Sequence, residues 1–262
     1  MKRKLKWRIE STGTEIVYED DDLVALNKPA GFLALPDRYN AKLPSLYGIL
    51  AEELGKIFVV HRIDKETSGI IVFAKTAEAH AALNEQFEGR RVEKVYQALV
   101  TGTPATSDGT IDLPLGESSR DRGVVKVDRK TGKESVTQYK VLEQFNGFAL
   151  LEARPRTGRM HQIRVHLQAI GLPILADRVY GNGKGFYLSH IKAGYKMEGE
   201  EKPLLDRTAL HAALIAFDHP AAGGRMTFSA PLPKDMSSVL KYLRKFKALE
   251  LRRMSPGPKP SV

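Results

Sequence analysis

The sequence predicts an α+β fold in which helices flank a central sheet. Strand-like and helix-like patterns follow each other without the strict alternation that a doubly wound fold requires. The pair Asn146-Gly147, set between alternating segments at 137–144 and 148–153, is a strong signal for a β-hairpin. No internal repeat or low-complexity linker divides the chain. We therefore expect one domain over residues 15–250.

The first half of the chain alternates short apolar segments with helices that have recognisable ends. Thr76 is a suitable N-cap, and Gly55 and Gly89 stand where helix C-caps belong. Pro29 lacks a backbone donor and ends the strand before it. These patterns predict strands over residues 15–18, 23–26, 57–60, 70–74 and 92–101, and helices over residues 46–54 and 77–88.

The second half opens with residues 102–132, which are rich in Gly, Asp, Ser and Pro and for which we expect an arm with short strands at best. Beyond it, the patterns predict strands over residues 137–144, 148–153, 212–218 and 225–229, and helices over residues 160–170 and 234–247. Residues 1–14 form a basic N-terminal extension in this interpretation. Residues 251–262 form a basic, Pro-rich tail that we expect to be disordered.

Composition narrows the possible functions. The 262 residues carry a formal net charge of +10, which favours a polyanionic partner such as nucleic acid, although a merely soluble basic protein has the same charge. The absence of cysteine excludes disulfides, thiolate metal sites and a cysteine nucleophile. No secretory signal or membrane-length apolar run is present, so we expect a cytoplasmic protein that does not bind membranes.

One loop between two predicted strands carries the sequence His61-Arg-Ile-Asp-Lys-Glu-Thr-Ser-Gly69. Loops held by a rigid scaffold often carry function. The cations beside Asp64 in sequence favour its ionised form, and an ionised, poorly solvated carboxylate is a competent nucleophile. The alternative is that Asp64 caps a turn and ties down the loop through Thr67 and Ser68.

Two other segments carry candidate binding groups. The stretch from Arg156 to His166 is dense in arginine and histidine, which suits phosphate or carboxylate binding but also a solvated helix face. On a predicted strand, Tyr96 shares a face with Lys94, and a ring beside a cation suits base stacking, although a core tyrosine has the same pattern. The spacing of His161 and His166 does not fit a zinc pair, so we expect no metal site.

These motifs, taken in order, resemble the RluA-type pseudouridine synthases from about residue 16 to residue 245. The resemblance rests on Asn27-Lys-Pro-Ala-Gly31, the 61–69 loop followed by Ala74-Lys75, Lys94-Val-Tyr96, the run from Arg156 to Arg164, and Leu210-His-Ala212 with His219-Pro220. It implies a pseudouridine synthase fold with a mixed, mainly antiparallel central sheet flanked by helices and loops. Within one loop, Leu172 and Ala176 depart from the usual His and Gly, whereas Asp177 and Tyr180 match.

The resemblance also implies roles for individual residues. Asp64 falls on the catalytic aspartate, Tyr96 on the tyrosine that stacks on the target base, and Arg164 on the arginine that pairs with the aspartate. Leu210 falls on an apolar residue that lines the uridine pocket. The remaining substrate-binding candidates are His61, Arg62, Thr67, Lys94 and Arg159.

The implied reaction isomerises uridine in RNA to pseudouridine without a cofactor or metal. We expect the substrate to be a structured stem-loop of ribosomal RNA, transfer RNA or both, and the enzyme to be a monomer. Only about 14 residues precede the first predicted strand, so we expect the N-terminal S4 RNA-binding domain of many relatives to be absent. The main alternative is a catalytically inactive RNA-binding module with the same fold. A carboxylate-based hydrolase is a weaker one, because only Glu66 could supply the paired acid.

Overall fold

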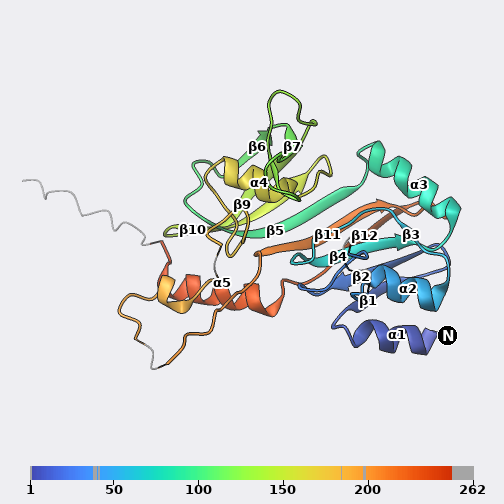
Figure 1. Cartoon of the computed structure of the whole chain (residues 1–262), viewed down its shortest axis with the longest axis horizontal. Coiled ribbons are helices and arrows are strands. Elements are labelled where there is room, and N and C mark those ends of the chain that lie inside the picture. Colours follow the sequence, from blue (N-terminus) through green and yellow to red (C-terminus); the bar gives the residue numbers. More distant parts are fainter. Residues whose placement is uncertain (1, 38–39, 41, 184, 197–198, 250–262) are drawn as a thin grey trace, which may run out of the picture.

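A computed structural model describes residues 2–37, 40, 42–183, 185–196 and 199–249 of the chain (Figure 1). The predicted disordered tail at residues 251–262 lies outside the described residues. The helices are α1 (Lys2–Glu10), α2 (Leu46–Leu54), α3 (Ala77–Glu88), α4 (Gln162–Ala169) and α5 (Lys234–Phe246), with a 3-10 turn at Leu188–His190. None of these helices is long and apolar enough to cross a membrane.

Ten strands form one large sheet in the order β1-β2-β4-β11-β5-β10-β9-β6, with β3 added beside β4 and β12 beside β11. Within the described residues the pairings are antiparallel except that of β4 with β11, which confirms a mixed, mainly antiparallel sheet. The strands are β1 (Glu15–Glu19), β2 (Leu23–Lys28), β3 (Phe58–Val59), β4 (Ser68–Ala74), β5 (Glu93–Thr101), β6 (Asp108–Asp112), β9 (Val136–Phe145), β10 (Phe148–Pro155), β11 (Leu210–Asp218) and β12 (Arg225–Ser229). The hairpin predicted at Asn146-Gly147 joins β9 to β10.

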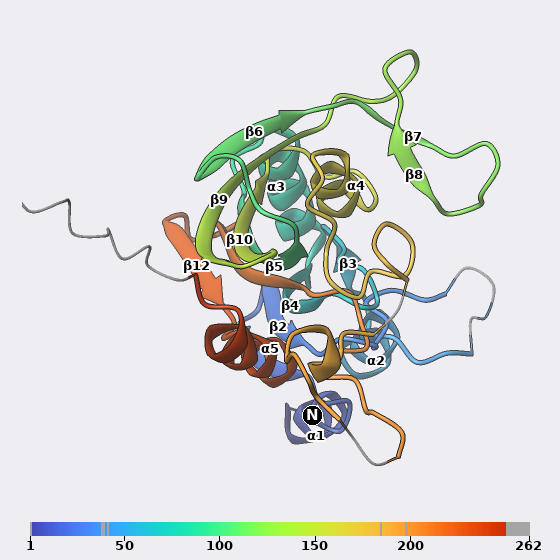
Figure 2. The ribbon, with the colours of Figure 1, turned by 90° about the vertical axis from the view of Figure 1, so that its left-hand side faces the viewer.

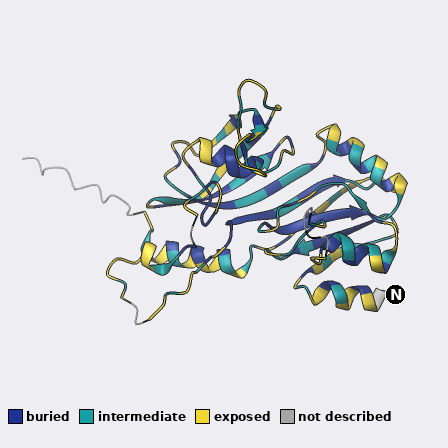
Figure 3. Cartoon of the chain, viewed as in Figure 1, coloured by how far each residue is buried: buried dark blue, intermediate teal, exposed yellow. Residues whose placement is uncertain are grey.

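Strand β4 is buried on both faces, which explains its uninterrupted apolar sequence (Figure 3). Ile71 and Phe73 pack with α1 and α2 on one face, whereas Ile70 and Val72 pack with α3 on the other. This double cover makes the centre of the sheet a rigid support for the loop that precedes β4.

The other half of the sheet packs with α4 and α5. Ile163 and Leu167 of α4 and Leu240 and Leu243 of α5 belong to one buried cluster with residues of β5 and β10. The predicted arm contains only short strands, namely β6 and the two-stranded unit β7 (Leu115–Glu117) with β8 (Val125–Val127). That unit stands away from the main sheet (Figure 2).

Several strand boundaries differ from the sequence-based expectation by one or two residues, and two helices differ in a way that has a clear physical cause. Residues 2–10 of the predicted N-terminal extension form helix α1, because Leu5 and Ile9 are buried in the cluster that includes α2 and Arg8 pairs with Glu53. The helix predicted from residue 160 begins at Gln162, because His161 has a left-handed backbone.

Candidate active site

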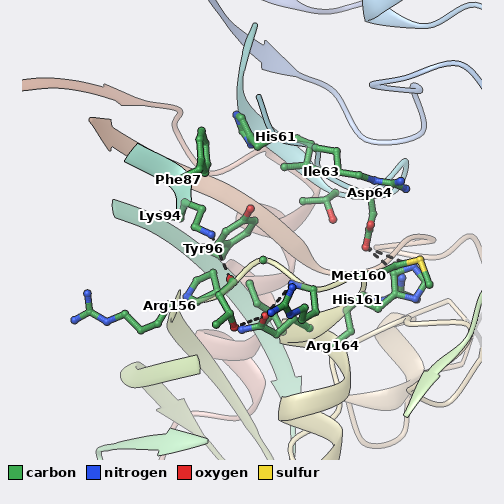
Figure 4. A pocket seen from close by; sticks show the side chains of 18 of the residues that line it. His61, Ile63, Asp64, Phe87, Lys94, Tyr96, Arg156, Met160, His161 and Arg164 are labelled. Atoms are coloured by element: carbon green, nitrogen blue, oxygen red, sulfur yellow. Dashed lines mark hydrogen bonds and ion pairs between the residues drawn. The ribbon is translucent and has the colours of Figure 1, made fainter. Parts of the chain in front are cut away.

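A cleft of about 630 Å³ lies between the loop before β4 and the segment that leads into α4, a volume in the range of small-ligand sites (Figure 4). Strand β5 contributes Lys94 and Tyr96 to it, and the end of α3 contributes Phe87. All nine residues proposed from the sequence line this cleft: His61, Arg62, Asp64, Thr67, Lys94, Tyr96, Arg159, Arg164 and Leu210.

Gly69 allows the loop at 61–67 to emerge beside β11. Its φ of +110° is disfavoured for other residues, and a Cβ on it would lie 2.1 Å from the carbonyl oxygen of Ala212. Only glycine therefore permits the close parallel pairing of β4 with β11 at this point.

Two buried cations hold the backbone of the loop. The Nζ of Lys28, which is inaccessible to solvent, donates to the carbonyl of Lys65 at 2.9 Å and to two carbonyls of the turn at 29–32. Burial lowers the pKa of Lys28 to about 7. From the other side, Arg207 donates to the carbonyl of Glu66 at 3.4 Å. The motif Asn-Lys-Pro-Ala-Gly thus supports the loop that carries Asp64.

The carboxylate of Asp64 points into the cleft and is 24% exposed. Its Oδ2 lies 3.4 Å from Nη1 of Arg164 and 3.8 Å from Nε2 of His161. The turn is closed by the Asp64 backbone carbonyl, which accepts the amide of Thr67 at 3.1 Å. This geometry disfavours the turn-cap alternative, since the side chain is directed at cleft residues instead. The pairing cation comes from α4, whereas the sequence neighbour Arg62 is exposed.

Arg164 is oriented by Asp177, a residue that the sequence analysis noted in its loop but did not place in the site. Nε and Nη2 of Arg164 donate to the two carboxylate oxygens of Asp177 at 2.6 and 2.8 Å. Burial opposes the charge on both partners, but their hydrogen bonds and charge interactions together outweigh it, so the pKa of Asp177 is lowered and that of Arg164 is raised. The third nitrogen of the guanidinium remains directed at Asp64.

Tyr96 and Leu210 supply apolar surface beside Asp64. Tyr96 pairs across the sheet with Ala153 on one side and Ala212 on the other, and these small residues leave room for its ring. Burial, with a contribution from the charge of Asp64, raises the pKa of Tyr96 well above its usual range, so the phenol stays neutral. A flat ring next to an ionised carboxylate is suited to holding a base against a nucleophile.

Lys94 and His61 stand at the other end of the cleft. Lys94 donates to the carbonyl of Thr157 at 3.3 Å, and burial lowers its pKa to about 8. His61 stacks on Phe87, and its Nε2 accepts the amide of Val72 at 2.9 Å. Burial lowers the pKa of His61 to about 3, so the ring is neutral and presents Nδ1–H as its remaining donor.

The opposite wall, residues 156–162, is fixed by a buried side chain that the sequence analysis did not single out. Gln162 accepts the hydroxyl of Thr157 and the amide of Arg159, and donates to β9 through Val136 and Thr137. His166, the other member of the rejected zinc pair, is buried between Thr137 and the carbonyl of Leu113.

Arg90, two residues beyond the end of α3, forms an exposed ion pair with Glu134 at the rim of the cleft. Nη2 of Arg90 lies 2.9–3.0 Å from both carboxylate oxygens, and the two side chains are 51% and 59% exposed. Arg159 and Arg156 extend the cationic rim. Exposed pairs of this kind exchange partners at little cost.

Among the described residues, Asp20, Asp22 and His219 form one group with metal-like spacing. Both ring nitrogens of His219 are engaged, Nε2 with Asp20 at 2.8 Å and Nδ1 with the amides of Ala221 and Ala222. None of the three residues lines the cleft. The group therefore joins two turns of the fold outside the cleft.

Comparisons with known proteins agree with this geometry. A family profile described as RNA pseudouridylate synthase matches residues 22–169. The chain is 38% identical over 244 residues to the uncharacterized RNA pseudouridine synthase YlyB of Bacillus subtilis, covering 90% of this chain and 75% of that one. It is 37% identical over 244 residues to ribosomal large subunit pseudouridine synthase D of Pseudomonas aeruginosa, covering 91% and 74%. The solved structure of human RNA Pseudouridylate Synthase Domain Containing 4 superposes with a TM-score of 0.68 at 26% identity, covering 93% and 98%. The fold implied by the sequence motifs is thereby confirmed.

Proposed function

Because the chain belongs to the RNA pseudouridylate synthase family, whose members are isomerases acting on RNA, we propose that it converts uridine to pseudouridine with Asp64 as nucleophile. The observation that carries this proposal is the placement of the Asp64 carboxylate. It faces Arg164 at 3.4 Å in a cleft that also contains Tyr96 and Leu210, and it takes no part in closing its own turn.

The reaction breaks the N1–C1′ bond of uridine and rejoins the base to the sugar through C5. The proton lost from C5 is balanced by the one gained at N1, so the step needs no co-reactant, and we propose that the enzyme uses no cofactor or metal. In our proposal, Asp64 initiates the cleavage of the glycosidic bond while Arg164 keeps the carboxylate ionised and oriented. Tyr96 and Leu210 hold the base between an aromatic and an apolar surface.

A uridine in structured RNA must leave its stack to reach Asp64, which costs a few kcal/mol. Stacking on Tyr96 offsets about 1–3 kcal/mol of this free-energy cost. Cations at the rim, including Arg62, Arg90 and Arg159, bind the flanking phosphates, and the net charge of +10 assists the encounter. Binding should therefore weaken steeply as salt is added.

For the substrate we propose ribosomal RNA of the large subunit, since relatives at about the same identity are named for that RNA. Transfer RNA is the second candidate, since the family resemblance implies either RNA. We further propose that residues 15–250 act as one catalytic domain and that the enzyme is a cytoplasmic monomer.

The test is to incubate the purified chain with transcripts of large-subunit ribosomal RNA and of transfer RNA, and to map pseudouridine in each. We expect formation at a specific uridine in ribosomal RNA. Asp64→Ala should abolish it while leaving RNA affinity nearly unchanged. Pseudouridine formation by Asp64→Ala would contradict the assignment of the nucleophile. A wild-type chain that binds RNA without modifying it would favour the inactive binding module.

A further inference from the structure

His161 has an unusual, left-handed backbone conformation. Its φ of 54° and ψ of 18° are left-handed, a region that residues other than glycine seldom occupy. Such conformations persist where the surroundings hold them, and they concentrate at functional sites. Here the conformation ends the 156–161 segment and directs the imidazole toward Asp64 (Figure 4).

Tyr180 holds the other side of the imidazole. Its hydroxyl lies 2.9 Å from Nδ1 of His161, and the two rings meet edge to face with centroids 5.5 Å apart. The same hydroxyl accepts the amide of Val125, on β8, at 2.8 Å. Val125 and Tyr180 are both buried in a cluster with Leu115 and Val165, so this contact is shielded from water.

One tautomer of His161 is consistent with all of these contacts and also directs a donor toward Asp64. With the amide of Val125 donating to the Tyr180 oxygen, the hydroxyl proton is available for Nδ1, and Nε2 then carries the ring hydrogen. Nε2 lies 3.8 Å from Oδ2 of Asp64, the same oxygen that faces Arg164. Catalytic contacts are often this long before substrate binds.

The charge state of His161 supports the same arrangement. Burial lowers the pKa of His161, and the nearby cations Arg164 and Arg62 act in the same direction. The carboxylates of Asp64 and Asp177 oppose this shift without cancelling it. A neutral imidazole with hydrogen on Nε2 donates to Asp64 without neutralising the carboxylate.

We propose that His161 is a positioning residue for Asp64, with its tautomer and orientation fixed by Tyr180. Arg164 and His161 then direct two donors to one oxygen, Oδ2, and leave Oδ1 of Asp64 for the substrate. This inference rests on the proposed function, since it assigns a role in the reaction of Asp64. It does not require that His161 contact the RNA.

Two conservative variants test whether His161 positions Asp64. His161→Asn suits the left-handed backbone and keeps a polar atom at the position of Nδ1, but is too short to reach Asp64. Tyr180→Phe keeps the ring and removes the hydroxyl. Tyr139→Phe is the matched control, because it removes a hydroxyl bonded to Thr106 at 3.0 Å outside the cleft.

The measurement is the single-turnover rate of pseudouridine formation at saturating RNA, together with the RNA dissociation constant and the melting temperature. We expect each of His161→Asn and Tyr180→Phe to lower the rate about tenfold, as for loss of one hydrogen bond to a charged group, with the dissociation constant unchanged. The double variant should be no slower than the slower single variant, because both changes interrupt the same series of contacts from Tyr180 through His161 to Asp64. Tyr139→Phe should match the wild type.

Three results would overturn the inference. Single variants that react at the wild-type rate would show that His161 does not position Asp64. Effects that multiply in the double variant, or that appear only in RNA affinity or melting temperature, would indicate separate structural roles. A wild-type chain that forms no pseudouridine in the same assay would remove the proposed function and this inference with it, whereas an active wild type with active variants would remove the inference alone.

Discussion

Two arginine–carboxylate pairs lie at different depths of the same cleft. Arg164 and Asp177 are 10% and 0% exposed, and the pair is bidentate. Arg90 and Glu134 are 51% and 59% exposed, and one guanidinium nitrogen serves both oxygens. The buried pair has no alternative partner in water and therefore fixes geometry, whereas the exposed pair can exchange its carboxylate for a phosphate. The comparison separates the groups that orient Asp64 from the groups that bind RNA.

Among the residues that support Asp64 or the rim, the largest effect is expected from Asp177→Asn, which retains the shape of the side chain but leaves Arg164 buried without its counter-charge. Breaking one partner of a buried pair costs about 3–5 kcal/mol of unfolding free energy. Loss of the orienting carboxylate should also lower the rate of pseudouridine formation by about a hundredfold. Urea unfolding and single-turnover assays measure both quantities.

Asp206→Asn is the matched control for Asp177→Asn. Asp206 pairs with Arg178, the residue after Asp177, but these side chains are 59% and 66% exposed. Its loss should cost at most about 1 kcal/mol and leave the rate unchanged. Equal effects of the two substitutions would remove the distinction between buried and exposed pairs.

Lys28→Met tests the other buried cation. Three backbone carbonyls, among them that of Lys65, lose their donor, and we expect a loss on the order of 2–3 kcal/mol in unfolding free energy. The loop that carries Asp64 should loosen, so the rate should fall more than RNA affinity. Lys126→Met, at an exposed position of β8, should change neither quantity.

The difference in unfolding free energy between the wild type and Lys28→Met should change with pH in a defined direction. Burial lowers the pKa of Lys28 to about 7 in the folded chain, against about 10.4 in the unfolded chain. Between these values the unfolded chain binds more protons, so the unfolding free energy of the wild type relative to Lys28→Met rises with pH. Below about pH 7 the difference should be constant, since Lys28 is protonated in both states. A difference that falls as pH increases above 7 would contradict this account.

At the rim, Arg90→Gln should weaken RNA binding by about three- to tenfold. It should also reduce the slope of the logarithm of the binding constant against the logarithm of salt concentration by about 1, while the reaction rate at saturating RNA stays unchanged. Glu134→Gln frees Arg90 for phosphate and should leave binding equal or slightly tighter. Filter binding at several salt concentrations measures both variants. Equal weakening by the two substitutions would show that the pair supports the fold instead of binding RNA.

The smallest effect is expected at Ala176, directly before Asp177. Its φ is 55°, in the left-handed region where relatives of the motif usually have glycine. Ala176→Gly should therefore raise the unfolding free energy by about 1 kcal/mol without changing the rate. Thermal unfolding resolves a change of this size, and a destabilised variant would show that the strain is relieved elsewhere.

Most strands and the residues that line the cleft could be predicted from the sequence, because their signals are local. Alternation, caps and the Asn146-Gly147 turn give the strands and helices, and the motif around Asp64 lies within nine residues. The roles of Lys28 and Asp177 were not predictable in the same way, because each acts through contacts with segments distant in sequence.

The misplaced boundaries have physical causes as well. Met160 extends the apolar spacing of α4, but the left-handed backbone of His161 separates it from the helix, so periodicity placed the helix start two residues early. Helix α1 depends on burial of Leu5 and Ile9 in the cluster with α2, and on a charge pair between Arg8 and Glu53. The basic sequence at residues 2–8 indicates neither of these interactions by itself.

The most direct test measures the single-turnover rate and the RNA dissociation constant for Asp64→Asn and Arg90→Gln on the same RNA. We expect Asp64→Asn to lower the rate by at least about a thousandfold with the dissociation constant within about twofold of the wild type. Arg90→Gln should show the opposite pattern, with weaker binding and a normal saturated rate. An Asp64→Asn variant that keeps its rate, or that loses affinity in proportion to rate, would contradict the account.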